Sequence, residues 1–197
     1  GVYIYQDGPF LVLQTADRLP SNYVDSFASA PDGGLWVGTD GGIVRLDPSD
    51  PSGEWKIYQD TTFPNMGGNW ASDIAVAPDG TVWVAVINGS ASRFQDNTWT
   101  AFDELYSYNT VIVDDNGYIW FGDDSKGITV LNPDGSEAMI LNETAGLPDD
   151  AVYALLKDDN GVIWIGTGQG LARYENGLTD VVFGPDDERL PSAYIRD

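Results

Sequence analysis

One short motif recurs four times along the chain and limits what it can fold into. In each copy a glycine precedes a tryptophan by three residues, as in "PDGGLWVG" at 31–38 and "DNGVIWIG" at 159–166. The four pairs are Gly33 and Trp36, Gly80 and Trp83, Gly117 and Trp120, and Gly161 and Trp164. The tryptophans lie 47, 37 and 44 residues apart, an interval typical of the blades of a β-propeller. Such a repeat predicts one four-stranded antiparallel sheet per copy.

The residues around the motif predict the individual strands. An apolar run such as "DIAVA" at 73–77 precedes an Asp-Gly or Asn-Gly turn, and a tryptophan strand such as "VIWIG" at 162–166 follows it. Third and fourth strands are expected at stretches such as "GLARY" (170–174) and "TDVVF" (179–183). Asp-Gly and Asn-Gly favour tight hairpins in which both central residues have positive φ. No segment has helical periodicity, so the expected fold class is all-β.

The boundaries of the blades follow from a second recurring motif. "LPSNYV" (19–24), "LPDDAV" (147–152) and "LPSAYI" (190–195) align, and each leads into the first strand of a repeat. Within a single propeller domain or segment over 1–197, complete blades are expected at 19–62, 63–104, 105–145 and 146–189. Residues 1–18 match the third and fourth strands of a fifth blade and 190–197 match its first strand. We therefore expect four complete blades and two halves of a fifth, in a chain that is a piece of a longer protein.

The pattern shared by residues 19–46 and 147–174 resembles the two-component regulator propeller repeat. That family forms β-propeller sensor domains, typically in the extracytoplasmic part of bacterial sensor histidine kinases. The second copy departs from the pattern, with "WVAVINGS", and the third carries "WFGDDSKG". The resemblance implies signal transduction and an extracellular or periplasmic location. The repeat is mainly structural, so it does not identify a ligand.

Composition excludes several classes of function. The chain has 31 acidic and nine basic residues, a formal net charge of −22, which repels nucleic acid. No run of 18 apolar residues is present, so no direct membrane insertion is expected. The chain has neither cysteine nor histidine, and therefore lacks a thiol nucleophile and the commonest general base. The "PDGxLW" elements at 31–36 and 78–83 also resemble those of virginiamycin lyases, whose chemistry resembles histidine-dependent catalysis. We expect no enzyme activity.

Several candidate sites have a structural interpretation. Gly166, Gly168 and Gly170 precede a strand, whereas a dinucleotide-binding loop precedes a helix. The four motif tryptophans are expected to pack between blades, with Trp55 and Trp99 partly exposed on outer strands. Acids at the motif hairpins are expected to support the turns: Asp32, Asp79, Asp115 and Asp159. Arg45, Arg93 and Arg173 occupy equivalent positions, which favours a recurring salt bridge. The alternative is that they line a patch for an anionic ligand.

Ligands of most propellers bind where loops enter the first strands and leave the second strands, at one mouth of the central channel. By this analogy the ligand-binding candidates, to which Tyr194 is added, are Asn22, Tyr23, Trp70, Asn109, Asp123, Asp124 and Gln169. The acidic turns at 47–50 and 123–125 offer oxygen ligands to Ca²⁺ but match no EF-hand loop, so no cofactor is expected and Ca²⁺ is the alternative. The expected function is a non-catalytic sensing or binding module for a small molecule or short glycan. The alternatives are a scaffold that binds a protein partner or self-associates, and a propeller lyase or hydrolase.

Overall fold

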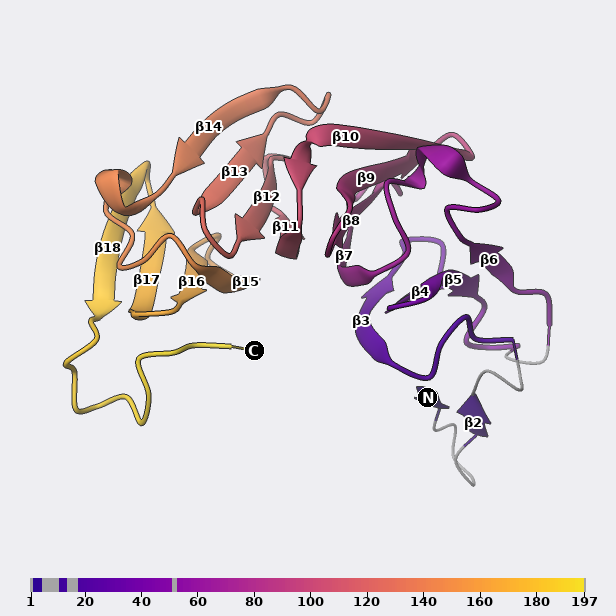
Figure 1. Ribbon diagram of the computed structural model, residues 1–197, viewed down its shortest axis with the longest axis horizontal. Helices are drawn as coiled ribbons and strands as arrows, with labels where there is room; N and C mark the ends of the chain where they lie inside the picture. The colour runs from indigo at the N-terminus through magenta and orange to yellow at the C-terminus, as the bar shows by residue number, and fades with distance from the viewer. Residues whose placement is uncertain (1, 5–10, 14–17, 51–52, 197) are drawn as a thin grey trace. The chain divides into compact units, whose positions relative to one another are not determined.

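The computed structural model describes residues 2–4, 11–13, 18–50 and 53–196. Within these ranges the regular structure consists of strands and two 3₁₀ turns, which confirms the all-β fold class (Figure 1). Four antiparallel sheets of four strands each follow one another along the chain, and within each sheet neighbours in sequence are neighbours in space. No helix in the described part of the chain is long and apolar enough to cross a membrane.

The first sheet contains β3 (Val24–Ser29), β4 (Leu35–Thr39), β5 (Gly42–Leu46) and β6 (Lys56–Tyr58). The second contains β7 (Ala71–Val76), β8 (Val82–Val86), β9 (Ser90–Gln95) and β10 (Thr98–Tyr106). The third contains β11 (Tyr108–Val113), β12 (Ile119–Asp123), β13 (Ile128–Leu131) and β14 (Glu137–Leu141). The fourth contains β15 (Val152–Lys157), β16 (Ile163–Thr167), β17 (Gly170–Glu175) and β18 (Leu178–Phe183). A hairpin of β1 (Val2–Ile4) and β2 (Leu11–Leu13) precedes them, and the 3₁₀ turns are η2 (Pro64–Met66) and η3 (Glu143–Ala145).

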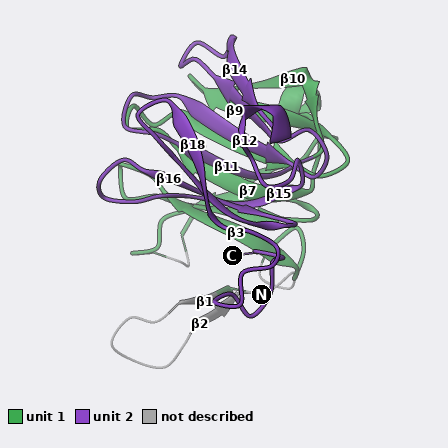
Figure 2. Ribbon diagram, turned by 90° about the vertical axis from the view of Figure 1, so that its left-hand side faces the viewer, with its two compact units in different colours: residues 1–107 green, residues 108–197 purple. Residues whose placement is uncertain are grey.

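The chain divides into two compact units, residues 1–107 and 108–197 (Figure 2). Unit 1 contains the β1–β2 hairpin and the first two sheets, and unit 2 contains the last two sheets. In unit 1 the buried Trp36 packs in an aromatic cluster whose members come from both sheets: Tyr58, Phe94 and Trp99, at ring-centroid distances of 5.5, 5.4 and 6.5 Å. In unit 2 Trp120 packs against Tyr174 of the fourth sheet at 4.9 Å. Trp36 and Trp120 thus fill the space between two sheets, as expected.

Two tryptophans of the outer strands differ from expectation. Trp55 is 8% exposed and Trp99 is 3% exposed, so the prediction of partial exposure was wrong for both. Trp99 is buried because its ring contacts those of Trp36 and Phe94, and Arg18 covers the ring of Trp55. Trp99 of the second sheet therefore belongs to an apolar layer shared with the first sheet. Its place on an outer strand did not predict this burial.

The motif hairpins have a different turn from the predicted one. In all four, the N–H of the motif glycine donates to the carbonyl three residues earlier, and φ of that glycine lies between +80° and +89°. The residue before each glycine does not have positive φ. The loop is thus a three-residue hairpin ending in a left-handed glycine, and the prediction that both central residues have positive φ was wrong here. That turn occurs instead between third and fourth strands, at Asp96–Asn97 and Asn176–Gly177.

The acid that supports the turn also shifts between the two units. Asp32 and Asp79 accept hydrogen bonds from the turn, from the N–H groups of Gly34 and Thr81. In unit 2 the first acid of each Asp-Asp pair takes this role: Asp114 Oδ2 accepts from the Trp120 indole at 3.1 Å, and Asp158 Oδ2 from the Trp164 indole at 3.0 Å. The assignment of Asp115 and Asp159 was therefore wrong. Asp114 and Asp158 stand three residues before the motif glycine, where unit 1 has Ala30 and Ala77, and from this position they reach the indole N–H.

A glycine two residues after each of three motif tryptophans marks where the next segment crosses closely. A Cβ on Gly38 would lie 2.8 Å from the carbonyl oxygen of Ala71 in β7, and one on Gly122 would lie 2.7 Å from Val152 Cγ1 in β15. A Cβ on Gly166 would lie 2.8 Å from Ile195 Cγ2. Ile195 also donates its N–H to the Thr167 carbonyl at 3.0 Å. No strand is assigned over 184–196. Ile195 nevertheless contacts the fourth sheet as Ala71 contacts the first sheet and Val152 contacts the third.

Candidate functional site

The loop end of unit 1 carries exposed aromatic side chains. Tyr23 precedes β3 and is 75% exposed, and Trp70 precedes β7 and is 40% exposed; Asn22 is exposed beside Tyr23. The Trp70 indole N–H donates to Asp25 Oδ2 at 3.1 Å. Burial raises the pKa of Asp25, the hydrogen bond from Trp70 opposes this, and the nearby charge of Asp40 adds to it. Sequence reasoning missed Asp25, although its place two residues after Tyr23 gives it the same side of the strand.

Unit 2 carries the other predicted residues, and two of them bond to the protein itself. Asn109 donates its amide to the Val152 carbonyl at 3.1 Å, which joins the third sheet to the fourth. The buried carboxylate of Asp123 accepts from the backbone N–H and hydroxyl of Ser125, at 2.7 and 2.9 Å. Asp124 and Gln169 are exposed. The candidates of unit 2 whose side chains face solvent are therefore Asp124 and Gln169, together with Tyr194, which is 43% exposed.

An aromatic pair that the sequence analysis did not combine lies at the same end of unit 2. The rings of Tyr153 and Tyr194 are 4.7 Å apart between centroids, and the Arg196 guanidinium lies 5.5 and 5.1 Å from them. Burial raises the pKa of Tyr153, as do Tyr194 and the charges of Asp124 and Asp149. Aromatic rings, a cation and carboxylates thus converge here. The alternation of "VYALL" in the first strand could have identified Tyr153.

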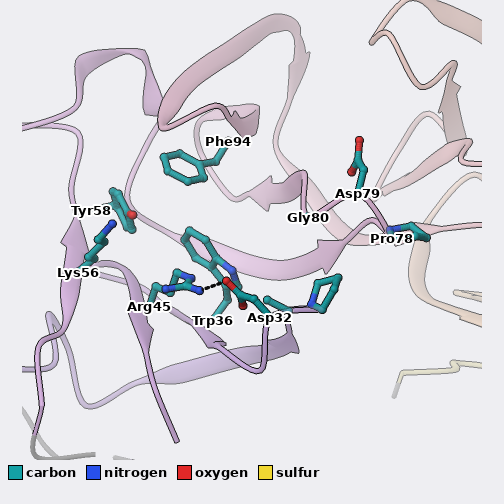
Figure 3. Close-up of a pocket in the computed structure, with 11 residues that line it drawn as sticks. Asp32, Trp36, Arg45, Lys56, Tyr58, Pro78, Asp79, Gly80 and Phe94 are labelled. Carbon is teal, nitrogen blue, oxygen red and sulfur yellow. Dashed lines mark hydrogen bonds and ion pairs between the residues drawn. The ribbon is translucent and has the colours of Figure 1, made fainter. Parts of the chain in front are cut away.

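A cleft opens at the opposite end of unit 1, beside the motif hairpins (Figure 3). It has a volume of about 430 Å³, and the rings of Trp36, Tyr58 and Phe94 line it together with Arg45 and Lys56. Asp32 and Asp79, from the turns of the two sheets, lie at its rim. Arg45 Nη2 pairs with Asp32 Oδ2 at 2.5 Å, and the guanidinium lies 5.9 Å from the centroid of the Trp36 ring. None of these residues was among the predicted ligand-binding candidates at the channel mouth, although Arg45 belongs to the patch that was the alternative for an anionic ligand.

Unit 2 has an equivalent cleft of about 520 Å³ between its own two sheets, lined by Trp120, Met139 and Tyr174. In the first sheet Arg45 of β5 lies directly opposite Lys56 of β6. In the third sheet Val130 of β13 lies directly opposite Met139 of β14. The two clefts therefore share their aromatic walls but differ in charge. The cationic pair is specific to unit 1.

The recurring arginines form ion pairs in two blades. Arg45 pairs with Asp32, and Arg173 pairs with Asp180 at 3.5 Å and Glu175 at 3.8 Å. Arg93 lies over the Trp83 ring at 5.5 Å and the Phe102 ring at 5.7 Å. The expected salt bridge thus recurs at Arg45 and Arg173, while a cation–π contact occurs at Arg93.

The acidic turns are closed by hydrogen bonds of their own. Asp47 accepts hydrogen bonds from the hydroxyl and N–H of Ser49, which lower the pKa of Asp47. Asp123 accepts hydrogen bonds from the hydroxyl and N–H of Ser125. Across the described residues, no three side chains of the metal-binding types are grouped so that they could hold an ion. The geometry gives these turns a structural role.

Comparison with known proteins supports the repeat assignment. A family model described as two-component regulator propeller matches residues 18–41 and 146–169. These segments are the beginnings of the first and fourth complete repeats. No curated protein sequence gives a significant match.

Solved structures show the propeller fold. An extracellular domain assigned to a hybrid two-component system of B. thetaiotaomicron has a TM-score of 0.72 at 17% identity, over 90% of this chain and 27% of its own. PorZ, a surface component of the Porphyromonas gingivalis type-IX secretion system, has a TM-score of 0.71 at 18% identity, over 98% and 32%. Catalytically inactive virginiamycin B lyase from Staphylococcus aureus, in complex with quinupristin, has 0.68 at 16% identity, over 87% and 58%. The chain spans about a quarter of the first of these structures.

Proposed function

Because this chain carries two-component regulator propeller repeats, we propose that it is a non-catalytic, ligand-binding sensor module in the extracellular or periplasmic part of a signalling protein. The observation that carries the proposal is the exposure of aromatic side chains at the loop ends. Tyr23, Trp70 and Tyr194 are 75%, 40% and 43% exposed. Aromatic rings with a polar tip are common in binding surfaces, where they contribute contact area at low entropic cost.

The chemistry of these ends favours a neutral or cationic small molecule or a short glycan. Asp25 accepts a hydrogen bond from Trp70 and is near the charge of Asp40, and Asp124 and Asp149 lie near Tyr153. Carboxylates accept hydrogen bonds from hydroxyl or ammonium groups, and the adjacent rings offer an apolar face for stacking. Anions are disfavoured at the loop end of unit 1, because the nearby charges there are those of Asp25 and Asp40.

Absence of histidine supports a non-catalytic role. The similar lyase structure is of a variant in which one histidine is replaced by alanine, and that variant is described as catalytically inactive. The present chain has no histidine that could act as a general base and no cysteine that could supply a thiolate. We therefore propose binding without turnover.

Trp70 provides the test, because it is the most exposed of the seven tryptophans. Five others are at most 8% exposed, and Trp164 is half-buried. Acrylamide quenching of wild-type and Trp70→Phe proteins isolates the Trp70 signal, which is then followed during titration with neutral oligosaccharides and cationic metabolites. We expect one compound class to protect Trp70, and Tyr23→Ala to weaken that binding by about tenfold, the effect of losing about 1.4 kcal/mol.

Ile140→Ala, a change at a 49% exposed residue of β14, is the matched control and should leave the affinity unaltered. The proposal is wrong for this end of unit 1 if no compound protects Trp70. It is also wrong if Tyr23→Ala binds as tightly as the wild type.

A scaffold function has an observation of its own. Phe27 of β3 is 53% exposed, and Leu156 of β15 is 63% exposed. In the second and fourth sheets the residues equivalent to Phe27 in register are Ile74 and Leu155, and both are buried. Exposed apolar side chains on sheet faces favour self-association or a protein partner. Native mass spectrometry separates the alternatives, because species at integer multiples of 21.3 kDa would support assembly and monomer alone would contradict it.

A further inference from the structure

Two cations face each other across neighbouring strands in the cleft of unit 1. Arg45 of β5 and Lys56 of β6 are register partners on the face that carries Trp36. Side chains directly opposite each other in an antiparallel pair have Cβ atoms roughly 5 Å apart, so like charges there repel. Among the described residues the arginine has Asp32 as its ion-pair partner, and no ion pair is formed by Lys56. In a chain with 31 acids against nine bases, such a pair is unexpected.

The other repeats show that the pair is not a requirement of the fold. At the same register position Arg173 faces Asp180, Arg93 faces Thr100, and Val130 faces Met139. An opposite charge, a neutral polar residue or an apolar residue is therefore found at this position in the other sheets. The first sheet alone places two cations there.

The surroundings of the pair define what could lie against it. The rings of Tyr58 and Phe94 form an apolar wall beside the two cations, and Asp79 stands on the turn of the second sheet with Oδ1 held by the Thr81 N–H (Figure 3). A volume of about 430 Å³ suits a small molecule. The charged groups of the cleft are thus two cations on one sheet and carboxylates on the turns.

We propose that this cleft binds a small organic acid with an aromatic or apolar ring. Its carboxylate lies between Lys56 and Arg45, and its ring lies against Tyr58 and Phe94. Charge-assisted hydrogen bonds from both cations hold the carboxylate and offset the repulsion between them. The site lies at the hairpin end of the sheets, away from the loop-end residues, so it does not depend on the sensor function proposed above.

The test uses phenylacetate as the probe and phenylacetamide as its uncharged analogue. Chemical shifts of the Trp36 indole and of the Gly33 and Gly80 amides report on the cleft, and those of Trp120 report on the equivalent cleft of unit 2. Phenylacetate should shift the unit 1 signals saturably. Phenylacetamide should bind about tenfold more weakly, because it carries no negative charge and has one acceptor oxygen in place of two. The unit 2 signals should not move.

Two variants complete the test. Lys56→Met installs the residue type found at the equivalent position in unit 2, and should weaken phenylacetate binding by about tenfold without changing the fold, as checked by the dispersion of the spectrum. Lys126→Met removes an exposed cation of unit 2 and should leave the affinity unaltered. Equal binding of acid and amide, unaltered affinity in Lys56→Met, or no saturable shift by phenylacetate would each overturn the proposal.

Because the loop-end experiment reads Trp70 and this one reads Trp36, either can fail while the other succeeds.

Discussion

Single carboxylates decide how the motif hairpins of unit 2 are held. Asp158 accepts from the Trp164 indole and from the backbone N–H groups of Asn160 and Val162. The hydrogen bond from Trp164 is the main reason why the pKa of Asp158 lies below its ordinary value of 3.8. Its neighbour Asp159 is exposed. The two adjacent acids thus differ in what they contribute to stability.

Asp158→Asn should therefore lower the Tm at pH 7 by several degrees, and Asp159→Asn should leave it nearly unchanged. The folded-state pKa of Asp158 is depressed, so its contribution is complete above pH 3.8 and is lost as pH falls through the lower folded value. The difference in Tm between the wild type and Asp158→Asn should accordingly become smaller below pH 3.8, as measured by thermal melts from pH 7 to pH 2. A gap that is the same at every pH would contradict this assignment.

At the scale of elements, glycines let one blade approach the next. Gly38 of β4 lies under Ala71 of β7, and the second repeat has the buried Ala85 at the equivalent position. Close backbone approach, and not turn chemistry, explains this glycine.

Gly38→Ala should reduce the free energy of unfolding by about 1–3 kcal/mol, because the new methyl group meets backbone that cannot move alone. Gly184→Ala is the control, since nothing lies within 4 Å of a Cβ there, and it should change stability by less than about 0.5 kcal/mol. Urea unfolding of both variants measures the difference. Equal stability of the two variants would show that the first sheet moves away freely.

The facing cations of β5 and β6 make a second prediction about elements. Lys56→Met should raise the free energy of unfolding by about 0.2–1 kcal/mol, because it removes repulsion from Arg45 and adds apolar surface beside Tyr58. Lys126→Met, which removes the partner of the buried Asp123 carboxylate at 3.7 Å, should lower it. Both are measured by urea unfolding without added organic acid. A loss of stability in Lys56→Met would show that attraction to the surrounding acids outweighs the repulsion.

At the scale of the whole molecule, charge dominates the response to solvent. The net charge of −22 opposes a compact state through self-repulsion, because acidic side chains far outnumber the basic ones that could pair with them. Raising the salt concentration shortens the Debye length from roughly 30 Å at 0.01 M to about 3 Å at 1 M. Long-range repulsion is therefore screened more than the close ion pairs.

We accordingly expect the Tm to rise as NaCl increases from about 0.01 to 1 M, by differential scanning calorimetry. CaCl₂ at matched ionic strength is the control, because an additional rise specific to Ca²⁺ would reveal a bound cation. A Tm that falls with NaCl would mean that ion pairs such as Lys157 with Asp115 dominate the electrostatic balance.

The sequence by itself determined the all-β class, the positions of the four complete sheets and the packing role of Trp36 and Trp120. These features follow from spacing, because alternation, turn residues and a repeated interval depend on neighbours along the chain. The same reasoning placed Tyr23 and Trp70 at a loop end, since each precedes the first strand of a repeat.

Only the tertiary structure decided which of two adjacent acids lies under a tryptophan, and which tryptophans of outer strands are buried. It also decided that Arg45 faces Lys56, and that Ile195 covers Gly166. Each of these depends on the register between strands or on contact between sheets, where a shift of one residue reverses the side-chain direction. Spacing along the chain does not contain that register, because it is set by packing between segments distant in sequence.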